Sequence, residues 1–158
     1  MQDLELSKLF VATYYILNVL VVLMTTTFLK RYFGRPRPSQ PDYTNEETRN
    51  RRTFDLRSAE TNCSFPSGDS AQAALFSFIL MQDFKLTFMI LGGPFGISQF
   101  VMAVCFARVY FHCHYLFDVL FGMMTGITVA TIIVRLGFKE LLKNIFFNYL
   151  QALIVGGS

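Results

Sequence analysis

Residues 9–28 read LFVATYYILNVLVVLMTTTF, a stretch of 20 residues without a charged side chain. A helix of about 20 apolar residues is long enough to cross the hydrocarbon core of a bilayer. Two further uncharged blocks lie at residues 86–107 and 119–134, and a shorter one covers residues 70–81. The sequence therefore predicts an all-α, polytopic membrane bundle of about four transmembrane helices.

The composition of the whole chain agrees with a membrane location. Of its 158 residues, 53% are hydrophobic and only 16% are charged, against roughly a quarter in ordinary soluble domains. The net charge of +3 gives no support to a nucleic-acid partner, which calls for a strongly basic surface. The length fits one domain, so we expect residues 1–158 to form a single integral-membrane domain.

The first apolar block is expected to be a retained span. Asp3 and Glu5 precede it, whereas a cleaved signal peptide begins with a basic segment and has a shorter apolar core.

The helix boundaries follow from the residues at the ends of the apolar blocks. A polar loop over residues 30–66 separates the first helix from the second. Pro-Ser-Gly-Asp at residues 66–69 should begin the second helix, because proline suits the first turn and Ser and Asp cap it. Gly92-Gly93-Pro94 should kink the third, since proline removes a backbone hydrogen bond. The expected helices cover residues 9–29, 66–82, 86–107 and 112–134.

The tail, residues 139–155, has apolar side chains at helical spacing, with Lys139, Glu140 and Lys143 near its start. This pattern predicts a C-terminal amphipathic helix that lies at the membrane interface or packs on the bundle. A simple continuation of the fourth helix is an equally good interpretation.

Three polar clusters stand at the ends of the expected helices. They read KRYFGRPRP at residues 30–38, FPSGD at residues 65–69 and RVYFHCHYLFD at residues 108–118. Counting the membrane crossings places all three at one face of the membrane, with both chain termini at the other. The core that carries these motifs is residues 9–134.

The clusters contain residues that suit a bound phosphate. Lys30, Arg37 and Arg108 could surround one tetrahedral anion, because the planar fork of arginine holds two oxygens at once. Ser67 and Gly68 would add backbone donors at a helix start, where the helix dipole favours negative charge. The sequence therefore predicts a phosphate site built from these five residues.

The third cluster also offers a nucleophile. His114 and Asp118 are four positions apart on the expected fourth helix, so their side chains share a face. The carboxylate can hold the imidazole in one tautomer and leave the other nitrogen to attack phosphorus. His112 and Cys113 beside them could suggest a metal, but adjacent side chains point to different faces and no fourth ligand is evident. We expect no metal and no other cofactor.

The remaining arginines near the first cluster are interpreted as anchors. Juxtamembrane cations usually hold a helix end or meet anionic headgroups. We expect this role for Arg31, Arg35, Arg51 and Arg52.

Taken together, these clusters resemble the three signature motifs of the type 2 phosphatidic acid phosphatase family, which shares its site with vanadium haloperoxidases. The first motif, Lys-x6-Arg-Pro, is matched by Lys30 and Arg37-Pro38. The second, Pro-Ser-Gly-His, is matched by residues 66–68, and Asp69 stands where the family has histidine. The third, Ser-Arg-x5-His-x3-Asp, is matched after its serine by Arg108, His114 and Asp118.

The resemblance implies a magnesium-independent phosphatase that acts on lipid phosphates or diphosphates. The three cations, with Ser67 and Gly68, would hold the phosphate. His114 would form a phosphohistidine, oriented by Asp118. The histidine of the family's second motif protonates the leaving oxygen, and that role would fall to Asp69.

Two departures from the family keep a second interpretation open. Members usually have six spans, whereas four are recognised here, and an aspartate is normally ionised at neutral pH. An ionised Asp69 would repel the substrate phosphate or pair with Arg37 or Lys30. The chain is then either an active lipid phosphatase with an unusual acid, or a catalytically impaired relative. The latter would serve as a structural or lipid-binding subunit of a larger membrane complex. Membrane lipids and a lipid phosphate head group are the expected partners, and other membrane subunits belong to the second interpretation.

Overall fold

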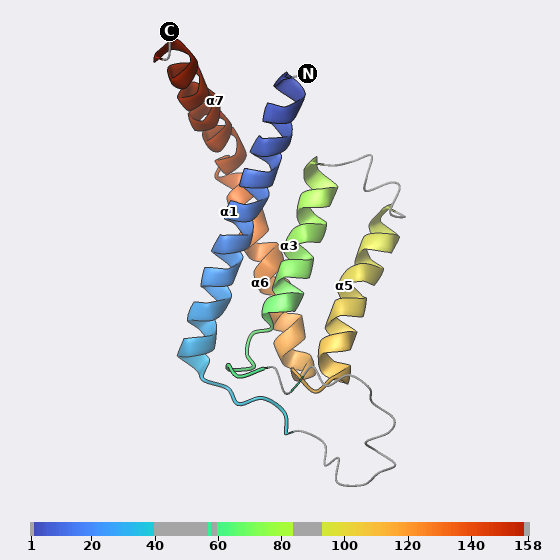
Figure 1. The fold of residues 1–158 in the computed structure, drawn as a ribbon. Coiled ribbons are helices and arrows are strands. Elements are labelled where there is room, and N and C mark those ends of the chain that lie inside the picture. Colours follow the sequence, from blue (N-terminus) through green and yellow to red (C-terminus); the bar gives the residue numbers. More distant parts are fainter. Residues whose placement is uncertain (1, 40–56, 58–59, 84–92, 157–158) are drawn as a thin grey trace.

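The computed structural model describes residues 2–39, 57, 60–83 and 93–156. These residues form a bundle of helices (Figure 1), and the all-α prediction is confirmed for them. The elements are α1 (Gln2–Phe33), α3 (Gly68–Asp83), α5 (Gly93–Tyr110), α6 (Leu116–Arg135) and α7 (Phe138–Gly156).

The course of the helices brings the three polar clusters to one end of the bundle. Helix α1 runs toward that end, α3 leaves it, α5 returns and α6 leaves it again (Figure 1). Both chain termini lie at the opposite end (Figure 1). The directions of these four helices agree with those counted from the sequence.

Among the described helices, α3 and α6 make the most extensive contact with each other. A Cβ added at Gly122 would collide with the backbone carbonyl of Ser67, and one at Gly126 with that of Ala71. Glycines at this spacing let two helix backbones approach each other more closely than any side chain allows. Ala71 also belongs to a buried apolar cluster with Val22, Leu75, Ile79 and Ala130. The contact therefore fixes the start of α3 against the start of α6.

The tail forms a helix that is set off from α6. Gly137 adopts the left-handed conformation, with a φ of 63°, which suits glycine at the end of a helix. Helix α7 then packs its aromatic side chains on α1, with ring centroids 5.8 Å apart for Phe10 and Phe146 and 6.4 Å for Tyr14 and Phe138. The tail is therefore a separate helix, and the alternative prediction of a simple continuation of the fourth helix was wrong.

Several predicted boundaries differ from the structure. The first helix runs from Gln2 to Phe33 and not over residues 9–29, and the second begins at Gly68 and not at residue 66. The fourth helix begins at Leu116 rather than His112, because the chain turns through residues 111–114 and His112 has a φ of 54°. Helix α5 is described from Gly93 and extends to Tyr110. The predicted start of the third helix, residues 86–92, and with it Gly92 of the predicted kink, lies outside the described residues.

Within the described residues, two helical segments are long and apolar enough to cross a membrane, Lys8–Phe33 and Leu116–Arg135. A third apolar segment, Ser98–Tyr110, is shorter. Helix α3 has 16 residues and so rises by about 24 Å, less than the roughly 30 Å of a hydrocarbon core.

Candidate functional site

Arg37 lies at the centre of the polar end, with its side chain 2% exposed. Its Nε donates to the backbone oxygen of Asn62 at 2.7 Å, and its Nη1 to that of Cys113 at 2.7 Å. Nη1 also lies 3.2 Å from His114 Nε2. Nη2 donates to Glu60 Oε2 at 2.6 Å and to the side-chain oxygen of Asn62. The five N–H groups of this guanidinium thus face five acceptors, drawn from two different loops.

Glu60 connects the two arginines that the sequence assigns to phosphate. Its second carboxylate oxygen accepts a hydrogen bond from Arg108 Nη2, so the carboxylate bridges Arg37 and Arg108. Burial opposes the charge of Glu60, but the hydrogen bond from Arg108 and the charges of Arg37, Arg108 and Lys30 outweigh it and hold the pKa of this carboxyl below its usual range. The position between the two arginines therefore holds an anion.

Lys30 reaches the same group of side chains. Its Nζ donates to Asn62 Oδ1 at 3.1 Å, the oxygen that also accepts from Arg37. The structure thus brings the three predicted phosphate ligands, Lys30, Arg37 and Arg108, around Glu60 and Asn62. Neither Glu60 nor Asn62 was singled out from the sequence as part of the site.

His114 is buried beside Arg37 and lies in the turn before α6, so the prediction that it sits on the same helix as Asp118 was wrong. A guanidinium only donates hydrogen bonds, so Nε2 accepts from Arg37 and the ring proton is on Nδ1. Burial, followed by the charges of Arg37, Arg108 and Lys30, lowers the pKa of His114 from 6.5 to about 3. The imidazole is therefore neutral, with an electron pair on the nitrogen next to the anion position.

Asp118 stands on the other side of the imidazole and is fully buried. Its Oδ2 lies 3.8 Å from His114 Nδ1, beyond hydrogen-bonding distance, and Nδ1 has no hydrogen-bond partner among the described residues. Oδ2 instead accepts from the backbone N–H of Tyr115 at 2.9 Å, which caps the start of α6. The structure brings Asp118 close to His114 and holds it there through the helix start.

The second partner of Asp118 is Arg35. Its Nη1 lies 2.8 Å from Asp118 Oδ1, and its guanidinium stacks over the Tyr115 ring, 4.3 Å from the centroid. Gly34, with a φ of 56°, ends α1 and turns the chain here. The structure thus gives Arg35 a partner inside the protein, which the membrane-anchor interpretation did not include, whereas Arg31 is exposed. Arg51 and Arg52 lie outside the described residues.

Ser67 directly precedes α3 and packs against Gly122 of α6, and Gly68 is the first residue of α3. The buried Ser67 hydroxyl accepts from the backbone N–H of Ser70 at 3.3 Å and from its hydroxyl at 3.0 Å. The Ser67 N–H donates to the backbone oxygen of Asp118 at 2.9 Å. In this structure Ser67 therefore caps α3 and ties it to α6, and Gly68 begins the helix.

Asp69 pairs with Arg108, not with Arg37 or Lys30 as the sequence suggested. Its Oδ2 lies 3.0 Å from Arg108 Nε, an ion pair that lacks hydrogen-bonding geometry, since this nitrogen has no hydrogen-bond partner within the described part of the chain. The Asp69 side chain is 56% exposed. Its place on the first turn of α3 sets it beside the end of α5.

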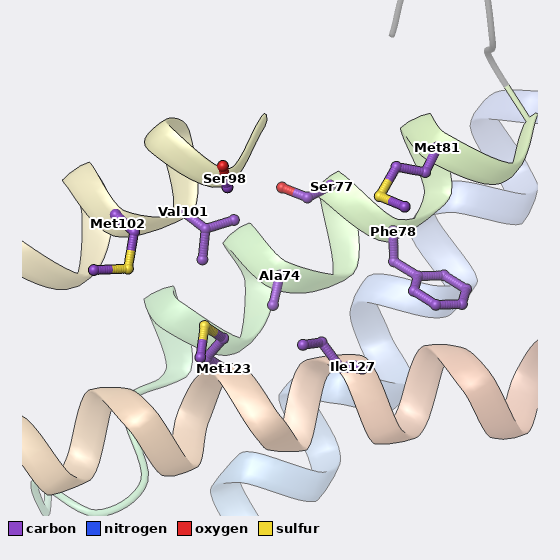
Figure 2. Close-up of a pocket in the computed structure, with 9 residues that line it drawn as sticks. All are labelled: Ala74, Ser77, Phe78, Met81, Ser98, Val101, Met102, Met123 and Ile127. Atoms are coloured by element: carbon purple, nitrogen blue, oxygen red, sulfur yellow. The ribbon is translucent and has the colours of Figure 1, made fainter. Parts of the chain in front are cut away.

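One pocket borders this site, and another lies further along the bundle. An open pocket of about 470 Å³ is lined at the polar end by Arg35, Gly34, Pro36 and three phenylalanines. A second pocket, of about 330 Å³, lies between α3, α5 and α6 (Figure 2). Its walls are almost wholly apolar, with side chains from the three helices pointing into one space, among them Ala74, Ser77, Val101, Met102, Met123 and Ile127.

Comparison with known proteins gives a consistent result. The profile of the PAP2 superfamily matches residues 11–141. Two curated relatives are lipid A 4'-phosphatases, from Rhizobium leguminosarum and Rhizobium etli. Each is 32% identical to this chain over 117 residues, which are 73% of this chain but 49% and 44% of the respective relative. The chain thus spans about half the length of the curated relatives it matches.

A solved structure shares the fold. It is the crystal structure of a transmembrane PAP2-type phosphatidylglycerolphosphate phosphatase from Bacillus subtilis, with a TM-score of 0.57 and 23% sequence identity. The match covers 81% of this chain and 58% of that one.

Proposed function

Because this chain is an integral membrane protein of the PAP2 superfamily, a family of membrane lipid phosphatases, we propose that it hydrolyses a lipid phosphate through a histidine nucleophile. The observation that carries the proposal is the position of His114 Nε2, 3.2 Å from Arg37 Nη1. A neutral imidazole there adjoins an anion position that Arg37 and Arg108 define.

The proposed reaction has two displacements at phosphorus. Lys30, Arg37 and Arg108 hold the phosphoryl oxygens and stabilise the charge that grows on them in the transition state. The electron pair of His114 Nε2 forms a bond to phosphorus while the bond to the lipid oxygen breaks, and that oxygen takes up a proton. Water then attacks the phosphohistidine, which releases phosphate and restores the imidazole. Asp118 stabilises the imidazole as it becomes positively charged.

We assign the acid that protonates the leaving oxygen to Asp69, since it contacts Arg108, a proposed phosphate ligand. A carboxyl group donates a proton only in its protonated form, and aspartate is normally ionised at neutral pH. General acid catalysis is worth about 10²- to 10⁴-fold, so we expect slow turnover at neutral pH.

The proposed substrate is a phosphate monoester or diphosphate carried by a membrane lipid. Two of the relatives are by name phosphatases of such lipids, a lipid A 4'-phosphatase and a phosphatidylglycerolphosphate phosphatase. We further propose that α1, α3, α5 and α6 span the membrane within one domain, and that α7 lies at the interface opposite the site. Because α3 is short, its start at Gly68 would then lie at headgroup depth.

Phosphate release from lipid phosphate by the purified chain, in detergent and with EDTA present, tests the proposal. We expect release that vanadate inhibits and that the substitution His114→Asn abolishes. His112→Asn is the matched control, because asparagine tolerates the positive φ at that position and His112 has no proposed role. Release that survives His114→Asn would contradict a histidine nucleophile here.

A second function is favoured by one observation, that Asp69 replaces the acid and is engaged with Arg108. On this alternative the chain binds lipid phosphate without turnover and acts as a subunit of a membrane complex. Turnover would then be absent in the wild type, partly restored by Asp69→His, and other membrane proteins would co-purify with the chain.

A further inference from the structure

We propose that Glu60 is an internal competitor of the substrate: its carboxylate fills the phosphate position between Arg37 and Arg108, and a phosphate binds there only by displacing it. The inference rests on the proposed function, in that it takes the position between these arginines as the substrate site. It adds a residue outside the three motifs, and it predicts how strongly the site holds a phosphate.

The first argument is that the position is occupied. Each carboxylate oxygen of Glu60 accepts from a different arginine, Oε2 from Arg37 and Oε1 from Arg108. The N–H groups of Arg37 already face acceptors on Glu60, Asn62, Cys113 and His114. A phosphate therefore cannot be added to Arg37; it has to exchange with a group that is already bound.

The second argument is that Glu60 is the group able to leave. Its backbone is fixed by Arg57, whose backbone oxygen accepts from the Glu60 N–H at 3.1 Å and whose Nη1 donates to the Glu60 carbonyl at 2.9 Å. Its side chain is 22% exposed, while the competing acceptor on Cys113 is a backbone carbonyl beside a buried side chain. Rotation of the Glu60 side chain opens the position without moving its backbone.

The third argument concerns charge. A phosphodiester carries one negative charge, so replacing the Glu60 carboxylate by a diester leaves the charge in the site unchanged and strips the new ligand of water. A phosphomonoester carries close to two negative charges above its second ionisation, at about pH 6, and so gains an extra attraction to the surrounding cations. Displacing Glu60 costs both esters the same free energy, so Glu60 lowers the affinity for both, and the monoester, which gains more from the cations, remains the tighter ligand. Among the described residues, the charged and titratable groups around the position are Lys30, Arg37, Arg57, Arg108, Asp69, Cys113 and His114.

Binding of two soluble probes to the purified full-length chain in detergent tests this inference by calorimetry. Methyl phosphate is a monoester and dimethyl phosphate is a diester. At pH 8 we expect the wild type to bind methyl phosphate and to bind dimethyl phosphate at least about tenfold more weakly. Binding of methyl phosphate should weaken as the pH falls below about 6. Equal affinity for the two probes in the wild type would overturn the inference without any variant.

The substitution Glu60→Gln removes the charge and keeps the shape. Because displacing the carboxylate costs both probes the same free energy, we expect this variant to bind each of them about tenfold more tightly and to keep its preference for methyl phosphate. Glu140→Gln, at an exposed position on α7, is the matched control and should retain the wild-type affinities.

Two outcomes for the variants would overturn the inference. One is an unchanged affinity for both probes in Glu60→Gln, which would make Glu60 a structural ion pair. The other is an equal gain in affinity in Asp69→Asn, since total charge rather than occupancy of the position would then set the affinity. Because the readout is binding, a chain that shows these shifts but releases no phosphate from lipid would contradict the proposed function and leave the role of Glu60 intact.

Discussion

The contact between α3 and α6 and the polar end of the bundle hold the same two helices in different ways. Along the contact, Gly122 and Gly126 meet the backbone carbonyls of Ser67 and Ala71 with no room for a side chain. At the polar end, the neighbours are joined by hydrogen bonds from Arg35 and other cations to carboxylates and carbonyls. The backbone packing contains no hydrogen bond that a ligand could replace. At the polar end, each hydrogen bond from a cation can be replaced by one to a ligand.

This difference explains how a rigid scaffold can carry a site that takes in a ligand. Because backbone packs on backbone, the start of α3 and the start of α6 keep their separation while ligands come and go. Glu60 and Asn62 sit on the loop before α3 and contact the site through side chains and carbonyls, so they can rearrange. We therefore expect substitutions in the helix contact to affect folding, and substitutions at the polar end to affect chemistry and charge.

The largest effect is expected for Gly126→Val. The added Cβ would collide with the Ala71 carbonyl, a backbone atom that cannot rotate away, so overpacking should cost more than about 3 kcal/mol. The yield of monodisperse protein and its thermal unfolding midpoint would both fall. Thr128→Val, at an exposed position of the same helix, is the control. A Gly126→Val protein as stable as this control would show that the helices separate easily.

Much of this arrangement follows from the sequence. The uncharged blocks predict the helices, and the order of crossings predicts that the three clusters meet, because both depend on composition and chain direction alone. Lys30, Arg37, Arg108 and His114 could be named as site candidates since their spacing matches known motifs, and the structure brings them together.

The remaining site residues could not be identified from spacing. Glu60 and Asn62 lie in a polar loop without periodicity, where only the folded backbone decides which side chain turns inward. Arg35 looks like any juxtamembrane cation until Gly34 turns the chain and Asp118 is seen to be buried. His114 lies outside α6 because the chain turns at residues 111–114. This turn needs a positive φ at His112, and nothing in the sequence indicates it.

An intermediate effect is expected from the charge of His114. Its pKa is lowered from 6.5 to about 3, so between these pH values the unfolded chain binds more protons than the folded one. Stability should therefore rise with pH across this window, by up to about 1.4 kcal/mol per pH unit. At pH values below the usual pKa range of a glutamate, the lowered pKa of Glu60 also makes the stability of the folded chain rise with pH.

Thermal unfolding between about pH 4 and about pH 6, inside the window that the two His114 pKa values define, measures this slope. His114→Asn should flatten it, whereas His112→Asn should leave it unchanged. Equal slopes in the two variants would mean that His114 is not the neutral, buried group described above.

The smallest effect, and the sharpest test of the comparison, concerns Arg35. Arg35 touches Asp118 and not the anion position, so it would act on the reaction only through the carboxylate beside His114. For Arg35→Gln we expect kcat for phosphate release to fall on the order of tenfold while the affinity for methyl phosphate is retained. Arg31→Gln, an exposed neighbour at the end of α1, should change neither quantity. If both substitutions lowered kcat equally, Arg35 would act through membrane anchoring. If Arg35→Gln weakened the binding of methyl phosphate and left kcat unchanged, Arg35 and Asp118 would belong to the anion site itself.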